Sequence, residues 1–287
     1  KKADIALYEA KKGGKNRIEF YDENVEATSF KRLDLEKNMR YATTNSCQEF
    51  EVYYQPIVDI SRPGDPCSGA EALIRWNSEA MGMISPSEFI PLAEYLGLIN
   101  PIGSFALKEA CHRCKYWNDM GHPEYHVNVN LSVVQLLQND MKEKVREVLE
   151  ETKMDPANLT LEVTESLAIN DMKRMKKILS DIKSLGVKVA LDDFGTGYSS
   201  LNHIRELPID IIKIDRCFII DIGKDEYAEA FVKMVSELAE TIGVRICVEG
   251  VEETEQVEKL RSMKGQYIQG YYYGKPMRAE DFEKKYL

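Results

Sequence analysis

The sequence predicts an α/β barrel, and two observations support that prediction. The first is that short apolar runs, typical of buried strands, alternate with amphipathic stretches whose outer faces are charged. The amphipathic stretches cover residues 104–120, 170–185, 226–242 and 253–263. This alternation favours parallel strand–helix units, and about eight of them would close into a (β/α)8 barrel.

The second observation is that the apolar runs contain or end in polar side chains able to bind a metal ion or a phosphate. These are Glu71 and Arg75 in GAEALIRW (69–76), Asn130 in HVNVNLS (126–132), Glu162 and Glu165 in NLTLEVTE (158–165), Lys213 and Asp215 in PIDIIKID (208–215), Glu249 in VRICVEG (244–250) and Gln269 in QYIQG (266–270). Barrel active sites lie at the carboxyl ends of the strands. Burying these charges without partners would be costly, so we interpret them as one site.

The segment VALDDFGTGYSSL (189–201) is the most informative of these runs. It ends in two adjacent carboxylates, Asp192 and Asp193, and hard divalent cations prefer oxygen ligands. Neighbouring strand residues point to opposite faces. Both carboxylates can therefore face one site only if the strand ends or bulges there, which Gly195 and Gly197 permit.

Taken together, these blocks resemble the EAL-domain family, the bacterial phosphodiesterases that open cyclic di-GMP. The namesake motif is Glu71-Ala72-Leu73. The other blocks follow in the family's order: YQPIVD (54–59), FIPLAEYLGLI (89–99), VNLS (129–132), LEVTES (161–166), LDDFGTGYSSL (191–201), LPIDIIKID (207–215), VEGVE (248–252) and QGYYYGKP (269–276). The resemblance covers about residues 30–287 and implies a modified TIM (β/α)8 barrel whose first strand, about 51–59, runs antiparallel to the others.

The resemblance also implies a role for each site residue. One divalent cation would be held by Glu71, Asn130, Glu162 and Asp192. Asp192 would bridge to a second cation, which Asp193 also binds. Glu249 would reach the attacking water directly or through the metal ligands, and Lys213 would hold that water near the scissile phosphate.

The substrate contacts are implied in the same way. Gln55, Leu73, Arg75 and Gln269 would contact the dinucleotide, and Asp215 would support the strand end beside it. Glu165 would hold the loop that contains Phe194, Gly195, Thr196, Gly197, Tyr198 and Ser199, which this family uses in dimerisation and activity. Two departures from the family pattern are Gln266, where an aspartate is usual, and a loop after Trp76 (NSEAMG) without the usual proline.

Composition limits the partners and the cofactor. The chain carries a net charge of −10, although the expected ligand is an anion. The positive charge must therefore come from metal ions, helped by Arg75 and Lys213. Five carboxylates and one amide offer no soft ligand, which favours Mg²⁺ or Mn²⁺ in a two-metal site. The family resemblance implies a homodimer, and we expect no DNA partner.

The first 25 residues have a sequence pattern that differs from that of the barrel. Residues 3–12 predict a short amphipathic helix that Gly13 and Gly14 end, and residues 16–21 predict a strand. This pattern resembles the C-terminal end of a GGDEF domain. We therefore divide the chain into a remnant and linker (1–25) and an EAL domain (26–287). A longer protein with an upstream GGDEF or sensor domain is expected.

Six scattered cysteines and no membrane-spanning apolar run indicate a cytoplasmic domain without membrane contact. The full-length protein could be anchored through upstream regions. Cys111 and Cys114 form a CxxC inside an amphipathic stretch and read as packing residues. His126, which opens a strand, reads as a packed residue or one behind the metal ligands. Ser85, Pro86 and Glu88 predict a helix start with a capping box.

The residues leave three functions open. The first is metal-dependent hydrolysis of cyclic di-GMP to linear pGpG. The second is a non-catalytic cyclic di-GMP receptor that signals through its dimer surface. The third is a glycosidase that uses a pair of carboxylates and needs no metal. A glycosidase has no evident use for an inward lysine among five carboxylates.

Overall fold

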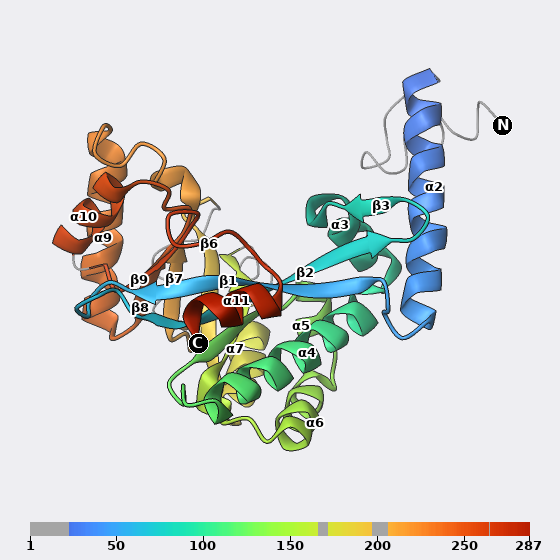
Figure 1. Ribbon diagram of the computed structural model, residues 1–287, viewed down its shortest axis with the longest axis horizontal. Coiled ribbons are helices and arrows are strands. Elements are labelled where there is room, and N and C mark those ends of the chain that lie inside the picture. The colour runs from blue at the N-terminus through green and yellow to red at the C-terminus, as the bar shows by residue number, and fades with distance from the viewer. Residues whose placement is uncertain (1–22, 166–171, 197–205, 264) are drawn as a thin grey trace.

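The computed structural model (Figure 1) is a closed barrel with helices around it. It describes residues 23–165, 172–196, 206–263 and 265–287, with side chains from residue 31 onward. The barrel strands are β1 (Phe50–Asp59), β2 (Cys67–Ser78), β4 (His126–Asn130), β5 (Leu159–Thr164), β6 (Lys188–Phe194), β7 (Ile211–Ile214), β8 (Arg245–Val248) and β9 (Tyr267–Gln269). The short strand β3 (Gly82–Ile84) pairs with β2 outside the ring.

The strand directions confirm the predicted modified barrel. β1 pairs antiparallel with both β2 and β9 and so closes the ring. From β2 through β9 the remaining neighbours in the ring are parallel. The carboxyl ends of the parallel strands therefore meet at one mouth, where the site was predicted.

Most of the helices lie between strands along the chain. The helices are α2 (Glu23–Thr44), α3 (Pro86–Leu96), α4 (Ile99–Asp119), α5 (Val133–Leu136), α6 (Met141–Thr152), α7 (Met172–Lys183), α9 (Glu226–Ile242), α10 (Thr254–Ser262) and α11 (Ala279–Tyr286), with the 3-10 turns η1 (Pro156–Asn158) and η3 (Arg216–Phe218). Along the chain, α3 with α4 and α5 with α6 follow one another directly. Figure 1 shows α2 and α3 at one end of the long axis and α9 and α10 at the other. The four predicted helical stretches are present.

Two local predictions need correction. α4 begins at Ile99, before the predicted residue 104, because Pro101 is tolerated in a first turn. Ser85 does precede α3, but its side chain makes no capping bond. Its hydroxyl lies 2.8 Å from that of Ser87, and Glu88 pairs with Lys31 instead of closing a capping box.

The interior of the barrel has two layers of different chemistry. On β1, β6, β7 and β8 the lower layer is apolar and contains Ile57, Ala190, Ile211 and Cys247, with Tyr267 of β9 packed against it. Two residues along the same strands, nearer the mouth, stand Gln55, Asp192, Lys213, Glu249 and Gln269. Because alternate strand residues share a face, both sets point into the barrel. The outer faces of the strands pack on the helices in a large hydrophobic core.

A second hydrophobic cluster joins α2 to the barrel. Leu35 and Met39 of α2 pack with Phe50, Trp76 and Phe89, and the ring of Trp76 stacks on Phe50 at 5.5 Å. This part of α2 thus packs with the barrel domain. The predicted GGDEF remnant lies outside the described residues.

Candidate active site

Asp192 and Asp193 end β6 at an irregularity. The pairing register between β6 and β7 shifts between Leu191 and Phe194, and Asp193 has a φ of 55°. This left-handed backbone is uncommon for a non-glycine residue and lets both carboxylates reach one place. One oxygen from each of Asp192, Asp193 and Glu249 lies within 4.8 Å of the others. The bulge predicted from the sequence is therefore present.

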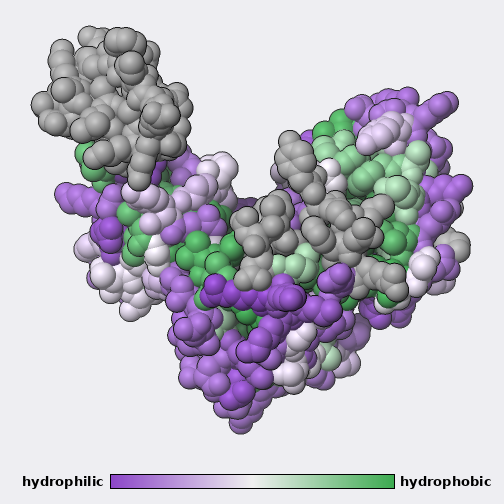
Figure 2. Space-filling model, turned by 180° about the vertical axis from the view of Figure 1, so that it is seen from behind, coloured by the Kyte–Doolittle hydropathy of each residue, from purple (hydrophilic) through white to green (hydrophobic). Residues whose placement is uncertain are grey.

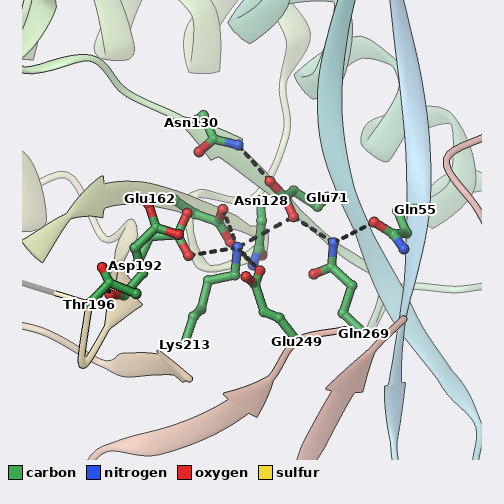
Figure 3. Close-up of polar contacts among 11 residues, drawn as sticks. Gln55, Glu71, Asn128, Asn130, Glu162, Asp192, Thr196, Lys213, Glu249 and Gln269 are labelled. Atoms are coloured by element: carbon green, nitrogen blue, oxygen red, sulfur yellow. Dashed lines mark hydrogen bonds and ion pairs between the residues drawn. The ribbon is translucent and has the colours of Figure 1, made fainter. Parts of the chain in front are cut away.

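Lys213 lies at the centre of the carboxylates (Figure 3) and is fully buried. Its Nζ is 2.6 Å from Oε2 of Glu162 and 2.7 Å from Oε1 of Glu249. It is 3.2 Å from Oδ1 of Asp192 and 3.3 Å from Oε2 of Glu71. β2, β5, β6, β7 and the end of β8 thus each contribute one charged group to a single cluster.

The charges in this cluster do not balance, and the pKa values reflect that. Burial raises the pKa of Glu162 well above its ordinary range, and Glu71 adds to the rise. Burial also raises the pKa of Glu249 to about 8, although Lys213 opposes the rise. Burial alone would lower the pKa of Lys213, but the carboxylates raise it well above its ordinary value. One ammonium is therefore not enough positive charge for four carboxylates.

Two amide side chains hold Glu71, and a third holds one of them. Asn130 donates to Oε1 at 2.6 Å, and Gln269 donates to Oε2 at 2.5 Å. Gln269 also donates to Oε1 of Gln55 at 3.0 Å, and Gln55 donates to the carbonyl of Gly274 at 3.1 Å. Burial would raise the pKa of Glu71, but Lys213 and these amides hold it below its usual value. The network fixes the Glu71 carboxylate at the mouth.

Gln55 and Gln269 were predicted to contact the dinucleotide. In this structure both are buried and hydrogen-bonded to each other, and Gln269 also donates a hydrogen bond to Glu71. Their contact with a substrate stays a prediction.

Two cavities open beside the cluster. The larger, about 330 Å³, contains the predicted substrate residues Leu73 and Arg75 and is otherwise mainly apolar. Burial lowers the pKa of Arg75, whose Nη1 donates to the carbonyl of Ile74 at 2.9 Å. The second cavity, about 260 Å³, is lined by Leu73, the carboxylates and Tyr271. Figure 2 shows the molecule hollowed between the lobe of α2 and α3 and the lobe of α9 and α10.

Gly195, in the segment directly after Asp193, has contacts on both sides. Glu165 accepts a hydrogen bond from the Gly195 amide at 2.9 Å, the contact expected of a residue that holds this loop. Gly195 has a φ of 99°, and a Cβ there would lie 2.5 Å from the ring of Phe218 and 2.6 Å from that of Phe231. Only glycine fits this position without displacing a ring.

The other predicted residues of this region have mixed outcomes. Phe194 is buried and stacks on Phe231 at 6.1 Å. The Thr196 hydroxyl donates to the carbonyl of Asp193 at 2.8 Å. Gly197, Tyr198 and Ser199 lie outside the described residues. Asp215 accepts a hydrogen bond from the Cys217 amide at 2.9 Å and caps η3, which supports the strand end.

Three residues near the site were missed by the sequence analysis. Asn128 donates to Oε1 of Glu162 at 2.7 Å. Arg216 and Glu252 form an ion pair of 3.0 Å at the rim of the smaller cavity, with the Arg216 stem against Gly250. The signal for Asn128 was available, because it precedes Asn130 by two residues and so shares its face of the strand. The signal for Glu252 was its place in the quoted VEGVE block.

The remaining candidates have packing roles. Cys111 and Cys114 are fully buried free thiols, and burial raises the pKa of Cys111 to about 12. His126 lies at the start of β4, away from the mouth. Burial lowers its pKa to about 4, and its ring packs edge-to-face on Tyr267 at 6.1 Å.

The residues present fit hard divalent cations. Glu71, Asn130, Glu162, Asp192, Asp193 and Glu249 offer only oxygen donors at the places named above, once the Asn130 amide is turned. The carboxylates have too little positive charge beside them, and the oxygens of Asp192, Asp193 and Glu249 already converge. The donor set and the charge excess therefore both support cation binding.

Comparisons with known proteins agree with this geometry. The EAL domain family profile matches residues 37–276. The chain is 38% identical over 278 residues to the bifunctional diguanylate cyclase/cyclic di-GMP phosphodiesterase MucR of Pseudomonas aeruginosa, covering 97% of this chain and 40% of that protein. It is 34% identical to the cyclic di-GMP phosphodiesterase PdeR of Escherichia coli, covering 99% of this chain and 42% of that protein.

A solved structure is also similar. It is the MucR phosphodiesterase in complex with cyclic di-GMP, with a TM-score of 0.81 and 38% identity, covering 87% of this chain and 99% of that one. The chain spans about two fifths of the length of the two curated relatives.

Proposed function

Because the chain belongs to the EAL domain family, we propose that it is a phosphodiesterase that hydrolyses cyclic di-GMP to linear pGpG. The observation that carries the proposal is the convergence of Glu71, Glu162, Asp192 and Glu249 on Lys213 at the barrel mouth. The proposal is supported by the names of the relatives and by the similar structure that contains cyclic di-GMP.

The cofactor we propose is a pair of Mg²⁺ or Mn²⁺ ions. Glu71, Asn130, Glu162 and Asp192 would hold one ion, and Asp192 and Asp193 the other. Bound ions would acidify the attacking water and offset the negative charge of the phosphate. This contribution is needed because the chain carries a net charge of −10 and the substrate is an anion.

The chain's own groups divide the remaining work. Glu249, whose carboxylate lies 2.7 Å from Lys213 at the barrel mouth, is placed to accept a proton from the attacking water. Lys213 supplies a fixed positive charge beside the developing negative charge on the phosphate. Arg75 lines the larger cavity close to Glu71 and can bind a phosphate oxygen pair. Leu73, Gln55 and Gln269 would contact the bases and sugars around it.

The rival functions differ from the proposal in measurable ways. A receptor would bind cyclic di-GMP and leave it intact. A glycosidase would need two carboxylates free to act as acid and base, whereas here the ammonium of Lys213 contacts four of them. We therefore favour the phosphodiesterase.

Several properties of the whole protein are part of the proposal. We propose an EAL domain at residues 26–287, an upstream GGDEF or sensor domain, and a cytoplasmic location for this domain. Among the described residues, no helix is both long enough and apolar enough to cross a membrane. We also propose a homodimer that uses the loop around residues 194–200 and nearby helices. In support, exposed Tyr227 and Met234 lie on α9, the helix whose Phe231 contacts this loop.

The test is incubation with cyclic di-GMP and Mg²⁺ or Mn²⁺, with products separated by chromatography. We expect linear pGpG, and we expect it to disappear with a chelator and in the Glu71→Ala variant. Intact but tightly bound cyclic di-GMP would indicate the receptor. Hydrolysis of a glycoside in the presence of chelator would indicate the glycosidase.

A further inference from the structure

Asn128 lies below the carboxylate cluster in the barrel. It was not among the site residues predicted from the sequence. It is in the middle of β4, is 1% exposed, and points into the barrel next to Glu162 (Figure 3). Its Nδ2 donates to Oε1 of Glu162 at 2.7 Å. The other oxygen of Glu162, Oε2, lies 2.6 Å from Lys213. The two oxygens of this carboxylate thus have separate partners, one below and one toward the mouth.

The chemistry of the contact fixes the orientation of Asn128. The Glu162 carboxylate is ionised when it binds a cation and then only accepts hydrogen bonds, so the amide nitrogen of Asn128 must face it. The amide oxygen Oδ1 must then face the other way. It is buried there and has no hydrogen-bond partner among the described residues. An unsatisfied buried acceptor is costly, which works against this orientation unless something else satisfies it.

Thr160 supplies the second half of that observation. It is the register partner of Asn128 on β5, fully buried, and its Oγ1 also has no hydrogen-bond partner among the described residues. Oδ1 of Asn128 and Oγ1 of Thr160 therefore belong to paired residues of neighbouring strands and form a small polar site inside the barrel. Buried water commonly bridges such groups.

We propose that Asn128 is a positioning residue for Glu162. Its amide holds Oε1 and directs Oε2 toward the cation. A water molecule between Oδ1 of Asn128 and Oγ1 of Thr160 keeps the amide in this orientation. This inference rests on the proposed function, since it assigns Asn128 to the cation site of that activity. Outer partners of this kind orient a metal ligand before the ion binds.

The test measures Mn²⁺ affinity, which is independent of turnover. The full chain is freed of metal and titrated with Mn²⁺, and free ion is followed by electron paramagnetic resonance. We expect Asn128→Leu, which keeps the size but removes the donor, to weaken Mn²⁺ binding about 10–100-fold. Thermal unfolding of the metal-free variant verifies that it is folded.

A double-mutant cycle separates positioning from general damage. In a Glu162→Gln background the Asn128→Leu change should have little further effect on Mn²⁺ affinity, because both act through one carboxylate. Effects that multiply in the double variant would overturn the inference. Equal Mn²⁺ affinity of Asn128→Leu and the unaltered protein would also overturn it.

Thr160→Val tests the water. We expect it to weaken Mn²⁺ binding in the same direction as Asn128→Leu but less, because the amide donor remains. Unchanged affinity in Thr160→Val would overturn the bridging water.

Different results would contradict the proposed function and this inference. If the unaltered protein binds Mn²⁺ but leaves cyclic di-GMP intact, the phosphodiesterase is wrong while the effect of Asn128 on Mn²⁺ affinity is still measured. If the unaltered protein binds no Mn²⁺, both are wrong.

Discussion

Two layers of the same barrel interior, two residues apart along the same strands, have opposite chemistry. The lower layer packs Ile57, Ala190, Ile211 and Cys247 together without a charged group. The upper layer gathers Asp192, Lys213 and Glu249 from the same strands, with Glu71 and Glu162 beside them. The lower layer has the packing expected of a structural core, whereas the upper layer concentrates buried charge that a barrel does not need in order to fold.

The difference shows that one layer stabilises the folded barrel while the other provides the groups for chemistry. Burying apolar side chains stabilises the barrel, and each fully buried one contributes about 1.5–3 kcal/mol. Burying charges is costly even when they are paired, and replacing such groups by apolar ones is often neutral or stabilising. The upper layer is therefore best explained by cation and substrate binding, and changes in the two layers should have different signatures.

The largest expected effect is that of Lys213→Met in the upper layer. It removes the one ammonium from four carboxylates, so hydrolysis of cyclic di-GMP should fall by about 10²–10³-fold, as when a fixed electrostatic donor is lost. The metal-free variant should also lose about 3–5 kcal/mol of unfolding free energy, because the charges are left uncompensated. Product chromatography and urea unfolding measure the two effects. Near-normal turnover would contradict the role of this layer.

Ile211→Ala is the matched change in the lower layer, two residues earlier on β7. It should cost about 2–5 kcal/mol of unfolding free energy through lost packing. Turnover by the folded fraction should persist, because Ile211 packs among the apolar residues of the lower layer. Urea unfolding and activity per folded molecule check this. A variant of normal stability with no activity would erase the distinction between the layers.

Gly195→Ala tests the connection from the upper layer to the loop after Asp193. A Cβ would collide with Phe218 and Phe231, so we expect about 1–3 kcal/mol of overpacking beyond the backbone strain. Gly243→Ala is the control, because it has a φ of 74° but open space around its Cβ. Thermal unfolding and Mn²⁺ affinity are compared. If the two variants are equally stable, the aromatic rings do not constrain the loop.

The last expected effect is a pH dependence of stability in the upper layer. The pKa of Glu249 is raised to about 8 in the folded protein, above its unfolded value of about 4.3. Its contribution is therefore complete below about pH 4 and is lost as the pH rises through about 8. Chelator-treated protein should become less stable from pH 6 to pH 9.

Mg²⁺ should reverse this trend, because cations bind the deprotonated carboxylates. The rise in melting temperature on adding Mg²⁺ should grow over the same pH range. Glu249→Gln should flatten the chelator-treated profile. A rise that stays constant with pH in the unaltered protein would show that Glu249 does not titrate against the cation.

Much of the fold and site could be predicted from the sequence, because strand periodicity and strand-end polarity are local signals. The two-aspartate bulge was predicted from adjacent carboxylates before glycines. The antiparallel first strand was predicted only through the family resemblance. The hydrogen bonds from Gln269 to Gln55 and Glu71 could not be predicted from the sequence, because they join residues far apart along the chain.

The errors have the same origin. The capping box failed because Glu88 pairs with Lys31, a residue on another helix. Arg216 and Glu252 were missed because their pairing depends on how η3 meets the segment after β8. Each of these errors concerns a tertiary contact that the local sequence pattern does not determine.

The most direct test of the account is a stepwise return of Mn²⁺ to chelator-treated protein. Bound Mn²⁺ and linear pGpG are measured in the same samples. The account predicts no product without ion, product that rises with bound Mn²⁺, and loss of both in Glu71→Ala. Product at zero bound Mn²⁺, or full Mn²⁺ binding without any pGpG, would contradict it.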